Sequence, residues 1–349
     1  MHLHGDIVEF DPCRDARWLP FVNRHARATV FHSVSWLEAL RQTYGFRTIA
    51  FGRVSSSDTL SSGVLLCEVR SWLTGNRLVS LPFSDHCEPL VENPEELQLL
   101  LAHVAQQRKK RNWRYIEVRP VSTEYSDAAG EPYRKFALHR LDLRPTTEEL
   151  FRKLHVDSIR RKIQKAEKSG LTIRSGRSDD LLADFFRLHV LTRRRQLSPP
   201  HPIAWFANVL RCLGHSACIR IAYVGETPAA AVFTLENEAA VVYKYGCSDE
   251  QFHRLGAMPF VFWDMIREAK RANKLGLDLG RSDLDNPGLI TFKERWGAQR
   301  QPLVYSRLPA VGNVLERGAG SSLAFKQLFR YCPDWLLIGA GKLLYPHIG

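Results

Sequence analysis

The sequence of 349 residues has no run of about 18 uninterrupted apolar residues, so we expect no membrane-spanning helix. Its first ten residues, MHLHGDIVEF, lack a charged segment followed by an apolar stretch, so no signal peptide is expected. The seven cysteines are scattered, without a Cys-x-x-Cys pair or the His and Cys spacing of a zinc site. We therefore expect reduced thiols, no metal site, and a cytoplasmic protein that can work at the inner face of the membrane.

Three catalytic motifs are also absent from the sequence: the GxSxG nucleophile elbow, the phosphate-binding P-loop and the HExxH zinc motif. Their absence argues against hydrolases, P-loop kinases and zinc proteases. What is present is an ordinary globular composition, 44% hydrophobic and 25% charged, with a net charge of +12. That excess favours anionic partners: a small-molecule or nucleotide-linked substrate, tRNA, or an anionic membrane surface in peripheral contact.

One stretch, Leu255 to Gly297, organises the rest of the chain. A glycine turn and Pro259 open a predicted helix, in which apolar residues recur at helical spacing. A short predicted strand, Leu277–Leu279, comes next, and the turn Gly280–Asp283 leads out of it. The Phe292-Lys293 and Trp296-Gly297 pairs complete the stretch.

This stretch ends a series of predicted elements whose order is also found in the first half of the chain. The first copy comprises, in order, strands at 63–69 and 77–81, a Ser84-Asp85 loop, a helix at 94–110, and a strand around Glu117. The second copy comprises strands at 229–235 and 239–245, a Ser248-Asp249 loop, a helix at 258–273, and a strand around Asp278. The matching order predicts a duplicated α/β unit.

Two residues are candidates for direct chemistry. Lys293 is flanked by bulky apolar neighbours, so its cation could lie beside a carbonyl or phosphate oxygen. The alternative is a lysine on the solvated side of a helical turn. Asp85 lies in a loop after a strand, beside His86, where a carboxylate could accept the proton of an amine. The alternative is an aspartate that caps its own turn.

Other residues are candidates for substrate or phosphate binding. Arg195 ends a Thr-x-x-Arg sequence, and Tyr243 and Tyr245 alternate along a predicted strand, so we expect them to share one face. Arg281 could bind a phosphate, or pair with Asp278 or Asp283. Trp36 is a further substrate-binding candidate on the apolar face of a helix near residues 31–41.

A cationic helix at 158–170 could hold a phosphate group through Arg160, Arg161 and Lys165. The run HRLGAM places Gly256 where backbone N–H groups at a helix N-terminus could receive a phosphate. For each of these candidates the alternative is structural: solvated basic runs, half-buried tyrosines, or a basic helix face in water.

The turn sequence Asp-x-Gly-Arg-Ser, followed by Gly-x-x-x-Phe-Lys-x-x-Trp-Gly, resembles the FemAB/FemX relatives of the GNAT acyltransferase superfamily, which have BioF2-like acetyltransferase domains. The helix SIRRKIQKAEKSG resembles the opening of that family's second domain. The resemblance implies two tandem GNAT-like α/β domains, each a mixed sheet flanked by helices. We expect the first at 1–144 and the second at 145–300. A strand and an amphipathic helical tail at 301–349 would pack on the first domain.

The resemblance also implies an N-acyltransferase that moves an acyl or aminoacyl group from an activated donor, with acyl-CoA favoured, to an amine. The amine would belong to a cell-envelope precursor such as an amino sugar or a peptidoglycan stem. Lys293 would stabilise the oxyanion, Asp85 would assist proton removal, and Arg195, Tyr243 and Tyr245 would line the acceptor site.

No tightly bound cofactor is expected, because acyl-CoA or aminoacyl-tRNA would serve as co-substrate. Three alternatives stay open. The first is an aminoacyl-tRNA-dependent peptidoglycan bridge ligase. The second is an RNA-binding protein without catalysis, and the third is a catalytically silent protein of the membrane surface.

Overall fold

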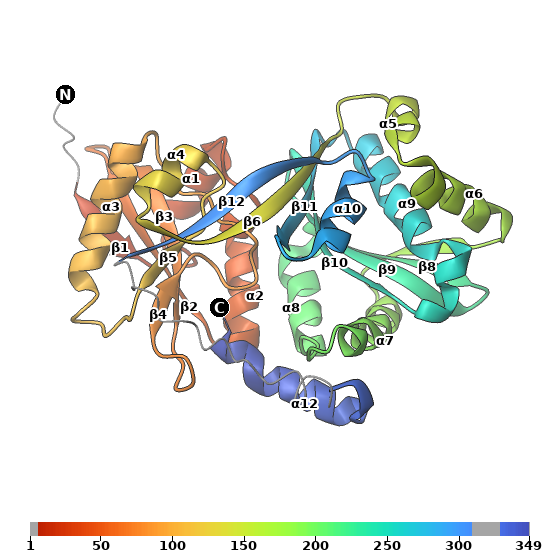
Figure 1. The fold of residues 1–349 in the computed structure, drawn as a ribbon. Helices are drawn as coiled ribbons and strands as arrows, with labels where there is room; N and C mark the ends of the chain where they lie inside the picture. Colours follow the sequence, from red (N-terminus) through yellow and green to blue (C-terminus); the bar gives the residue numbers. More distant parts are fainter. Residues whose placement is uncertain (1–5, 309–328, 349) are drawn as a thin grey trace. The chain divides into compact units, whose positions relative to one another are not determined.

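The computed structural model describes residues 6–308 and 329–348, which form two compact units (Figure 1). The first unit contains the described residues up to Phe136, those from Pro302 to Leu308, and those from Leu343 onward. The second contains Ala137–Gln301 and the described residues up to Lys342. The chain enters the second unit within strand β6 (Glu131–Asp142), earlier than the boundary expected at residue 144.

The first unit is built on a mixed sheet. Its strands follow the order β1 (Ile7–Phe10), β2 (Arg47–Val54), β3 (Leu60–Val69), β4 (Arg77–Val79), β5 (Ile116–Val118) and β12 (Gln299–Leu308). Neighbouring strands are antiparallel, except for β4 and β5, which are parallel. A parallel pair needs a crossover, and helix α3 (Pro94–Gln107) supplies it.

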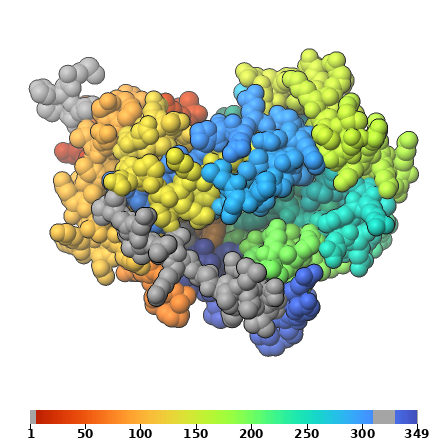
Figure 2. All heavy atoms as spheres, in the orientation of Figure 1, coloured from red at the N-terminus to blue at the C-terminus, as the bar shows by residue number. Residues whose placement is uncertain are grey.

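Helices cover both faces of this sheet. Helix α3 starts where the Asn93 side chain accepts a hydrogen bond from the Glu96 N–H, with Pro94 at the first helical position, and its leucines join a core with alternate residues of β2 and β3. Side chains of α3 and α4 (Thr123–Ala128) cover one face in Figure 2. Helices α1 (Trp18–Arg24) and α2 (Val34–Tyr44) lie on the other face, where Gly63 leaves room for the Trp18 ring.

The second unit repeats this plan. Its strands follow the order β6, β11 (Gly276–Asp283), β10 (Ala240–Ser248), β9 (Thr227–Glu236), β8 (Ala217–Val224) and β7 (Thr172–Gly176). Only β10 and β11 are parallel among the pairs with a described register in this unit. Strands β1–β5 therefore correspond to β7–β11, which confirms the fold class: two tandem α/β units, each a mixed sheet flanked by helices.

Two pairs of helices flank the second sheet. On one face, Phe185 of α7 (Asp179–Arg195) and Phe206 of α8 (Ile203–Leu213) pack their rings on Phe233 of β9. On the other, α6 (Arg161–Lys168) and α9 (Ala257–Arg271) share a core with the strands. Helix α5 (Thr147–Lys153) begins with a Thr146–Glu149 capping box.

The C-terminal tail departs from the expectation that all of it packs on the first domain. Helix α12 (Asp334–Leu344) belongs to the second unit as far as Lys342. Arg194 donates a hydrogen bond to the Cys332 carbonyl (2.6 Å) and forms an ion pair with Asp334. Gly341 lies so close to the Pro200 carbonyl that a Cβ at this position would not fit. The chain from Leu343 and the second half of β12 do belong to the first unit.

The sequence predicted reduced cysteines and no membrane-spanning helix. No disulfide joins any of the seven cysteines, all of which lie in the described ranges. Burial raises the pKa of the Cys67 and Cys247 thiols, so they are poor nucleophiles. Within residues 6–308 and 329–348, no helix combines the length and apolar content needed to cross a bilayer.

Candidate active site

The second unit has a point of divergence between its two parallel strands. The register of β10 and β11 comprises three residue pairs, from Ala240 opposite Gly276 to Val242 opposite Asp278. Beyond it, β10 stays paired with β9 through a bulge between Tyr243 and Tyr245. Ligands of open α/β sheets bind at the carboxyl ends of strands, and bulges are common beside such sites. We take this divergence point as the candidate active site.

Lys293 lies at the carboxyl end of β11. It is carried by helix α10 (Pro287–Glu294), which the Asn286 side chain caps. Its Nζ donates hydrogen bonds to the carbonyl oxygens of Gly280 (2.8 Å) and Arg281 (2.9 Å). Only 2% of the residue is exposed, so the alternative of a solvated lysine is wrong. A buried ammonium needs such oxygen partners, and they fix its charge beside the divergence point.

An aromatic cluster surrounds this part of the site. Phe262 of α9 stacks on Trp296 with ring centroids 4.3 Å apart, and its ring also meets Tyr243 (5.1 Å) and Phe292 (5.8 Å). Water is excluded from such surroundings, so a fixed charge there interacts more strongly with a developing oxyanion than it would in water.

His139 of β6 is a residue that sequence reasoning missed. Its side chain is fully buried, and its Nε2 lies 3.9 Å from a carboxylate oxygen of Glu294. Burial, followed by the charge of Lys293, lowers the pKa of His139 below its ordinary 6.5, so the ring is neutral at pH 7. A neutral imidazole near the ammonium can accept a proton. The only available signal was one histidine in the apolar strand Phe136–Leu141.

The Ser84-Asp85 loop of the first unit is held by side chains. Trp36 donates its indole N–H to the Ser84 hydroxyl (3.1 Å), and Tyr305 donates its hydroxyl to the Asp85 carbonyl. Phe83, just before them, adopts a positive φ of 60°, a conformation that bulky residues rarely tolerate. Asp85 is half-buried, whereas Trp36 is fully buried. Trp36 is therefore positioned to hold the loop, which corrects its assignment as a substrate-binding residue.

The first unit has its own parallel strand pair, but a side chain fills the place where the strands end. Glu117 lies opposite Val79 as Asp278 lies opposite Val242, so Arg119 and Gly280 occupy equivalent positions. The buried Arg119 donates to the carbonyls of Leu81 (3.0 Å) and Ser84 (3.3 Å) and pairs with Glu117. The second unit has Gly280 at this position, so no side chain extends from it toward Lys293.

Arg195 connects the end of α7 to the end of β10. Its guanidinium donates to the carbonyl and hydroxyl oxygens of Ser248, both at 3.2 Å. Thr192 bonds the same residue through its hydroxyl, and His253 lies 2.9 Å from the Ser248 hydroxyl. Burial and then Arg195 lower the pKa of His253, which favours its neutral form. Arg195 thus lies where β10 leads into helix α9.

The expectation that Tyr243 and Tyr245 share a face is wrong. The bulge between them adds one residue to β10 and sends the two rings to opposite faces. Tyr243 packs on Phe262 of α9, and Gly246 leaves room for its hydroxyl. Tyr245 lies among the rings of α7 and α8 and accepts a hydrogen bond from the Trp205 indole (2.9 Å). Only Tyr243 reaches the aromatic cluster beside Lys293.

The predicted phosphate-binding residues differ in their surroundings in the structure. Gly256 has a φ of +79°, and a Cβ there would lie 2.4 Å from the Lys162 carbonyl oxygen, so the glycine lets α6 approach the start of α9. Arg161 pairs with Asp157 at the surface (2.6 Å), and Lys165 is exposed. Arg160 is half-buried, and its Nε has no hydrogen-bond partner among the described residues.

The second unit thus brings most of the predicted residues to two neighbouring places. Lys293, Arg281 and Tyr243 lie at the divergence point, and Arg195 and Gly256 lie at the start of α9. Asp85 and Trp36 belong to the first unit. Among the described residues, no group of three or more His, Cys, Asp or Glu side chains is arranged to hold a metal ion.

Comparisons with known proteins agree with this geometry. Residues 153–294 match the family model of the acetyltransferase (GNAT) domain. The fold is similar to that of FemX, with a TM-score of 0.66 and 15% identity over 86% of this chain and 96% of that one. The fold is also similar to that of a tandem GNAT protein from the clavulanic acid biosynthesis pathway. The TM-score is 0.56 and the identity 10%, over 87% of this chain and 98% of that one.

A third similar structure is the C-terminal domain of a putative lysylphosphatidylglycerol synthetase from Agrobacterium fabrum. Its TM-score is 0.52 and its identity 12%, over 82% of this chain and 91% of that one. The search of curated proteins gives no match.

The matched domain, together with the tandem fold, defines an acyltransferase of the GNAT class. The fold is similar to that of FemX, so a place in the FemAB-like branch of that class stays a prediction from the sequence motifs.

Proposed function

We propose that the chain is an N-acyltransferase that moves an acyl or aminoacyl group from an activated donor to an amine of a cell-envelope precursor. The acceptor would be an amino sugar or a peptidoglycan stem. The observation that carries the proposal is the buried ammonium of Lys293, fixed by two carbonyl oxygens where β10 and β11 diverge. A fixed cation in an apolar site is suited to a carbonyl that gains negative charge.

In the proposed reaction, the amine nitrogen attacks the donor's carbonyl carbon. A C–N bond forms, and an electron pair moves to the carbonyl oxygen beside Lys293. The pair then returns, the bond to the donor's sulfur or ribose oxygen breaks, and the leaving group departs with that bond's electrons. The amine gives up a proton to a carboxylate or imidazole, for which Asp85 and His139 are the two candidates.

We favour acyl-CoA as the donor. Arg195 and His253 lie at the start of α9, and the N-terminal end of a helix attracts phosphate groups. The net charge of +12 supports the same kind of donor. The cell-envelope acceptor is supported by the likeness to FemX and to a protein named as a lysylphosphatidylglycerol synthetase.

An aminoacyl-tRNA donor is the second candidate, because the same positive charge suits tRNA and the fold is similar to that of FemX. A thermal-shift screen separates the two. Acetyl-CoA, a longer acyl-CoA and charged tRNA are compared on the wild type and on Lys293→Ala. A ligand at about 100 times its Kd should stabilise the fold by roughly 2.7 kcal/mol.

A shift with one donor, followed by turnover that Lys293→Ala abolishes, would support the transferase and name its donor. The matched control is Lys274→Ala, since Lys274 is also a largely buried lysine of the second unit that donates to a carbonyl, that of Asn237. Folded wild-type protein that responds to none of the three donors would contradict the proposal.

Asp85→Asn and His139→Gln distinguish the two proton acceptors. The variant that removes the base should lower kcat by about 100-fold or more while donor affinity stays within a few-fold of wild type. The other variant should keep most of its activity. Equal, small effects for both would exclude both residues as the base.

A further inference from the structure

An exposed apolar patch lies on the first unit, where the loop between β3 and β4 meets the C-terminal segment. Its members are strongly exposed: Trp72 (84%), Leu73 (50%), Leu343 (74%) and Ile348 (50%). The Trp72 ring meets the His347 ring edge-on, with centroids 5.7 Å apart. We call these four residues the Trp72 patch. Its side chains come from both ends of the sequence, yet lie in one unit.

Hydrogen bonds hold the patch in place. The buried Arg77 donates to the Thr74 hydroxyl (2.6 Å) and to the His347 carbonyl (2.9 Å), so it fastens the C-terminal segment to the loop. The Ser71 hydroxyl accepts from the N–H groups of Leu73 and Thr74. The large apolar side chains are therefore presented on a fixed backbone, and exposed apolar patches of this kind mark interaction sites.

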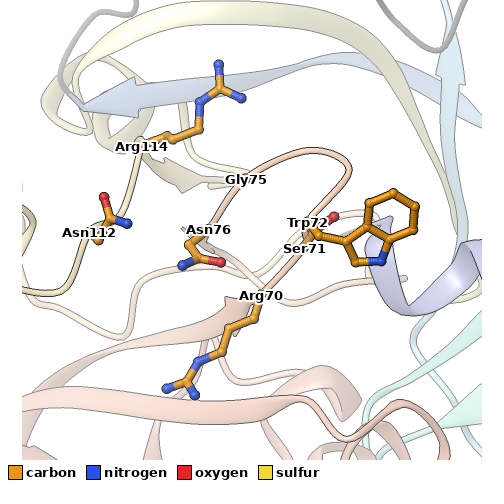
Figure 3. A pocket seen from close by; sticks show the side chains of 7 residues that line it. All are labelled: Arg70, Ser71, Trp72, Gly75, Asn76, Asn112 and Arg114. Atoms are coloured by element: carbon orange, nitrogen blue, oxygen red, sulfur yellow. The ribbon is translucent and has the colours of Figure 1, made fainter.

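The surroundings of the Trp72 patch are cationic. Arg70 and Arg114 line an adjoining pocket with Asn76 and Asn112, and Figure 3 shows the two arginines pointing away from each other on either side of Asn76. Lys109 and Lys110 are exposed in the turn just before Asn112. The buried Glu68 pairs with Arg70 (2.8 Å) and accepts a hydrogen bond from the Trp113 indole.

We propose that the Trp72 patch docks the protein on an anionic phospholipid surface. Trp72 and the three aliphatic side chains would enter the boundary between headgroups and acyl chains, where tryptophan is preferred. Arg70, Arg114 and the lysines would lie against lipid phosphates. A tryptophan that projects from the surface beside arginines suits a lipid boundary.

Helix α12 offers independent support within its own length. Its only charged residues are Asp334 and Lys342, and its buried positions, Leu337 and Gly341, lie one turn apart on one side. Trp335 and Leu336 are nevertheless exposed. A helix with apolar side chains on its outward side, one of which is Leu343 of the Trp72 patch, is typical of segments that lie on a membrane surface.

The test is co-sedimentation of the full chain with vesicles. Vesicles of phosphatidylcholine with 30% phosphatidylglycerol are compared with pure phosphatidylcholine at about 0.1 M salt, where surface charges still act over roughly 10 Å. The wild type should bind the anionic vesicles at least tenfold more strongly. Trp72→Ser/Leu73→Ser should lower that binding at least tenfold. The matched control is Leu19→Ser, since Leu19 is 53% exposed on α1 of the same unit and should bind as wild type.

A second pair of variants tests the charge. Lys109→Glu/Lys110→Glu should weaken binding by about fivefold or more for each residue. Arg152→Glu/Lys153→Glu makes the same change in net charge on α5 of the second unit and should have a smaller effect. Equal losses for the two pairs would overturn the assignment of the binding surface.

Three results would overturn the proposal: no preference of the wild type for anionic vesicles, unchanged binding by Trp72→Ser/Leu73→Ser with a wild-type melting temperature, or a wild-type dimer that this variant dissociates. The last result would assign the patch to a second copy of the chain. None of them depends on catalysis, because binding is measured without donor or acceptor.

Discussion

The two units share a strand order but differ where their parallel strands separate. In the first unit, Arg119 fills the space after β5 and bonds two carbonyls of the loop that carries Asp85. In the second, the equivalent position is Gly280, whose carbonyl accepts a hydrogen bond from Lys293. A buried cation is thus found at both places. One holds its own loop, and the other stands beside the divergence point that we propose as the active site.

This difference suggests how a duplicated fold can divide its work. The first unit uses its cation for stability: Glu117 lies between Arg119 and Arg307, and both contact its carboxylate. Burial alone would raise the pKa of Glu117, yet the two arginines hold it below its ordinary value. In the second unit, the Lys293 ammonium donates to the carbonyl oxygens of Gly280 and Arg281, which hold its charge beside the divergence point.

The largest expected effect comes from removing the second unit's cation. Lys293→Met should lower kcat by about 10²–10³-fold, because one fixed donor to an oxyanion contributes that much. Donor Kd should change by only a few-fold. Single-turnover rates and donor titration measure the two separately, with Lys274→Met as control. A Kd that rises as much as kcat falls would assign Lys293 to ground-state binding instead.

The same substitution in the first unit should act on stability. Arg119→Met leaves Glu117 buried with one arginine fewer and should lower the free energy of unfolding by about 3 kcal/mol. Denaturant titration measures this loss. If His139 rather than Asp85 is the base, the fraction that remains folded should keep near-normal kcat. If Arg119→Met abolished kcat in folded protein, the contrast between the two units would fail.

Acid should weaken both units through buried histidines, among them His32 in the first and His189 in the second. Burial lowers the pKa of His32 to about 4 and that of His189 to about 3, so the folded state binds fewer protons than the unfolded state. Stability is therefore full above pH 6.5 and falls as the pH drops below it, by about 2 kcal/mol per histidine at pH 5.

His189→Phe should remove its share of that acid loss with little change at pH 7, since its Nε2 has no hydrogen-bond partner among the described residues. His32→Phe should also cost about 1 kcal/mol at pH 7, because His32 bonds the Glu88 carbonyl. Unfolding titrations at pH 7 and pH 5 measure both. An unchanged acid loss in His189→Phe would show that its burial does not persist in solution.

The smallest effect concerns the bulge of β10. Tyr245→Phe removes the hydrogen bond from the Trp205 indole and should cost about 1 kcal/mol of stability without changing kcat. Tyr243→Phe alters the face beside Lys293 and should change kcat or KM more than stability. Paired melting and rate measurements on the two variants check this. Equal catalytic effects would mean that both rings reach the site after all.

Much of this arrangement follows from the sequence, because the repeated order of strands, loop and helix predicted the duplicated fold. The Phe-Lys and Trp-Gly pairs also drew attention to Lys293, whose catalytic role stays a prediction. Its burial could not be predicted, since the carbonyls of Gly280 and Arg281 become its partners only when α10 folds back on β11.

Other features depend on tertiary structure that periodicity does not show. One bulge residue reversed the face of Tyr245, although the alternation of the tyrosines was clear. In the sequence, His139 is one residue of a predicted strand, and its electrostatic interaction with Lys293 is visible only in the folded unit. Helix α12 was predicted as amphipathic, but the Arg194 and Pro200 contacts that assign it to the second unit come from residues far away in the chain.

Hydrogen exchange of the full chain, with and without its donor, tests the central claim most directly. The donor is the one that shifts the melting temperature. The account predicts that it slows exchange at Tyr243–Ser248 of β10 and at Leu279–Asp283 of β11, while Val79–Asp85 and Ile116–Arg119 of the first unit are unaffected. Protection confined to those first-unit segments would contradict the account, because it would place the donor where Arg119 already fills the space.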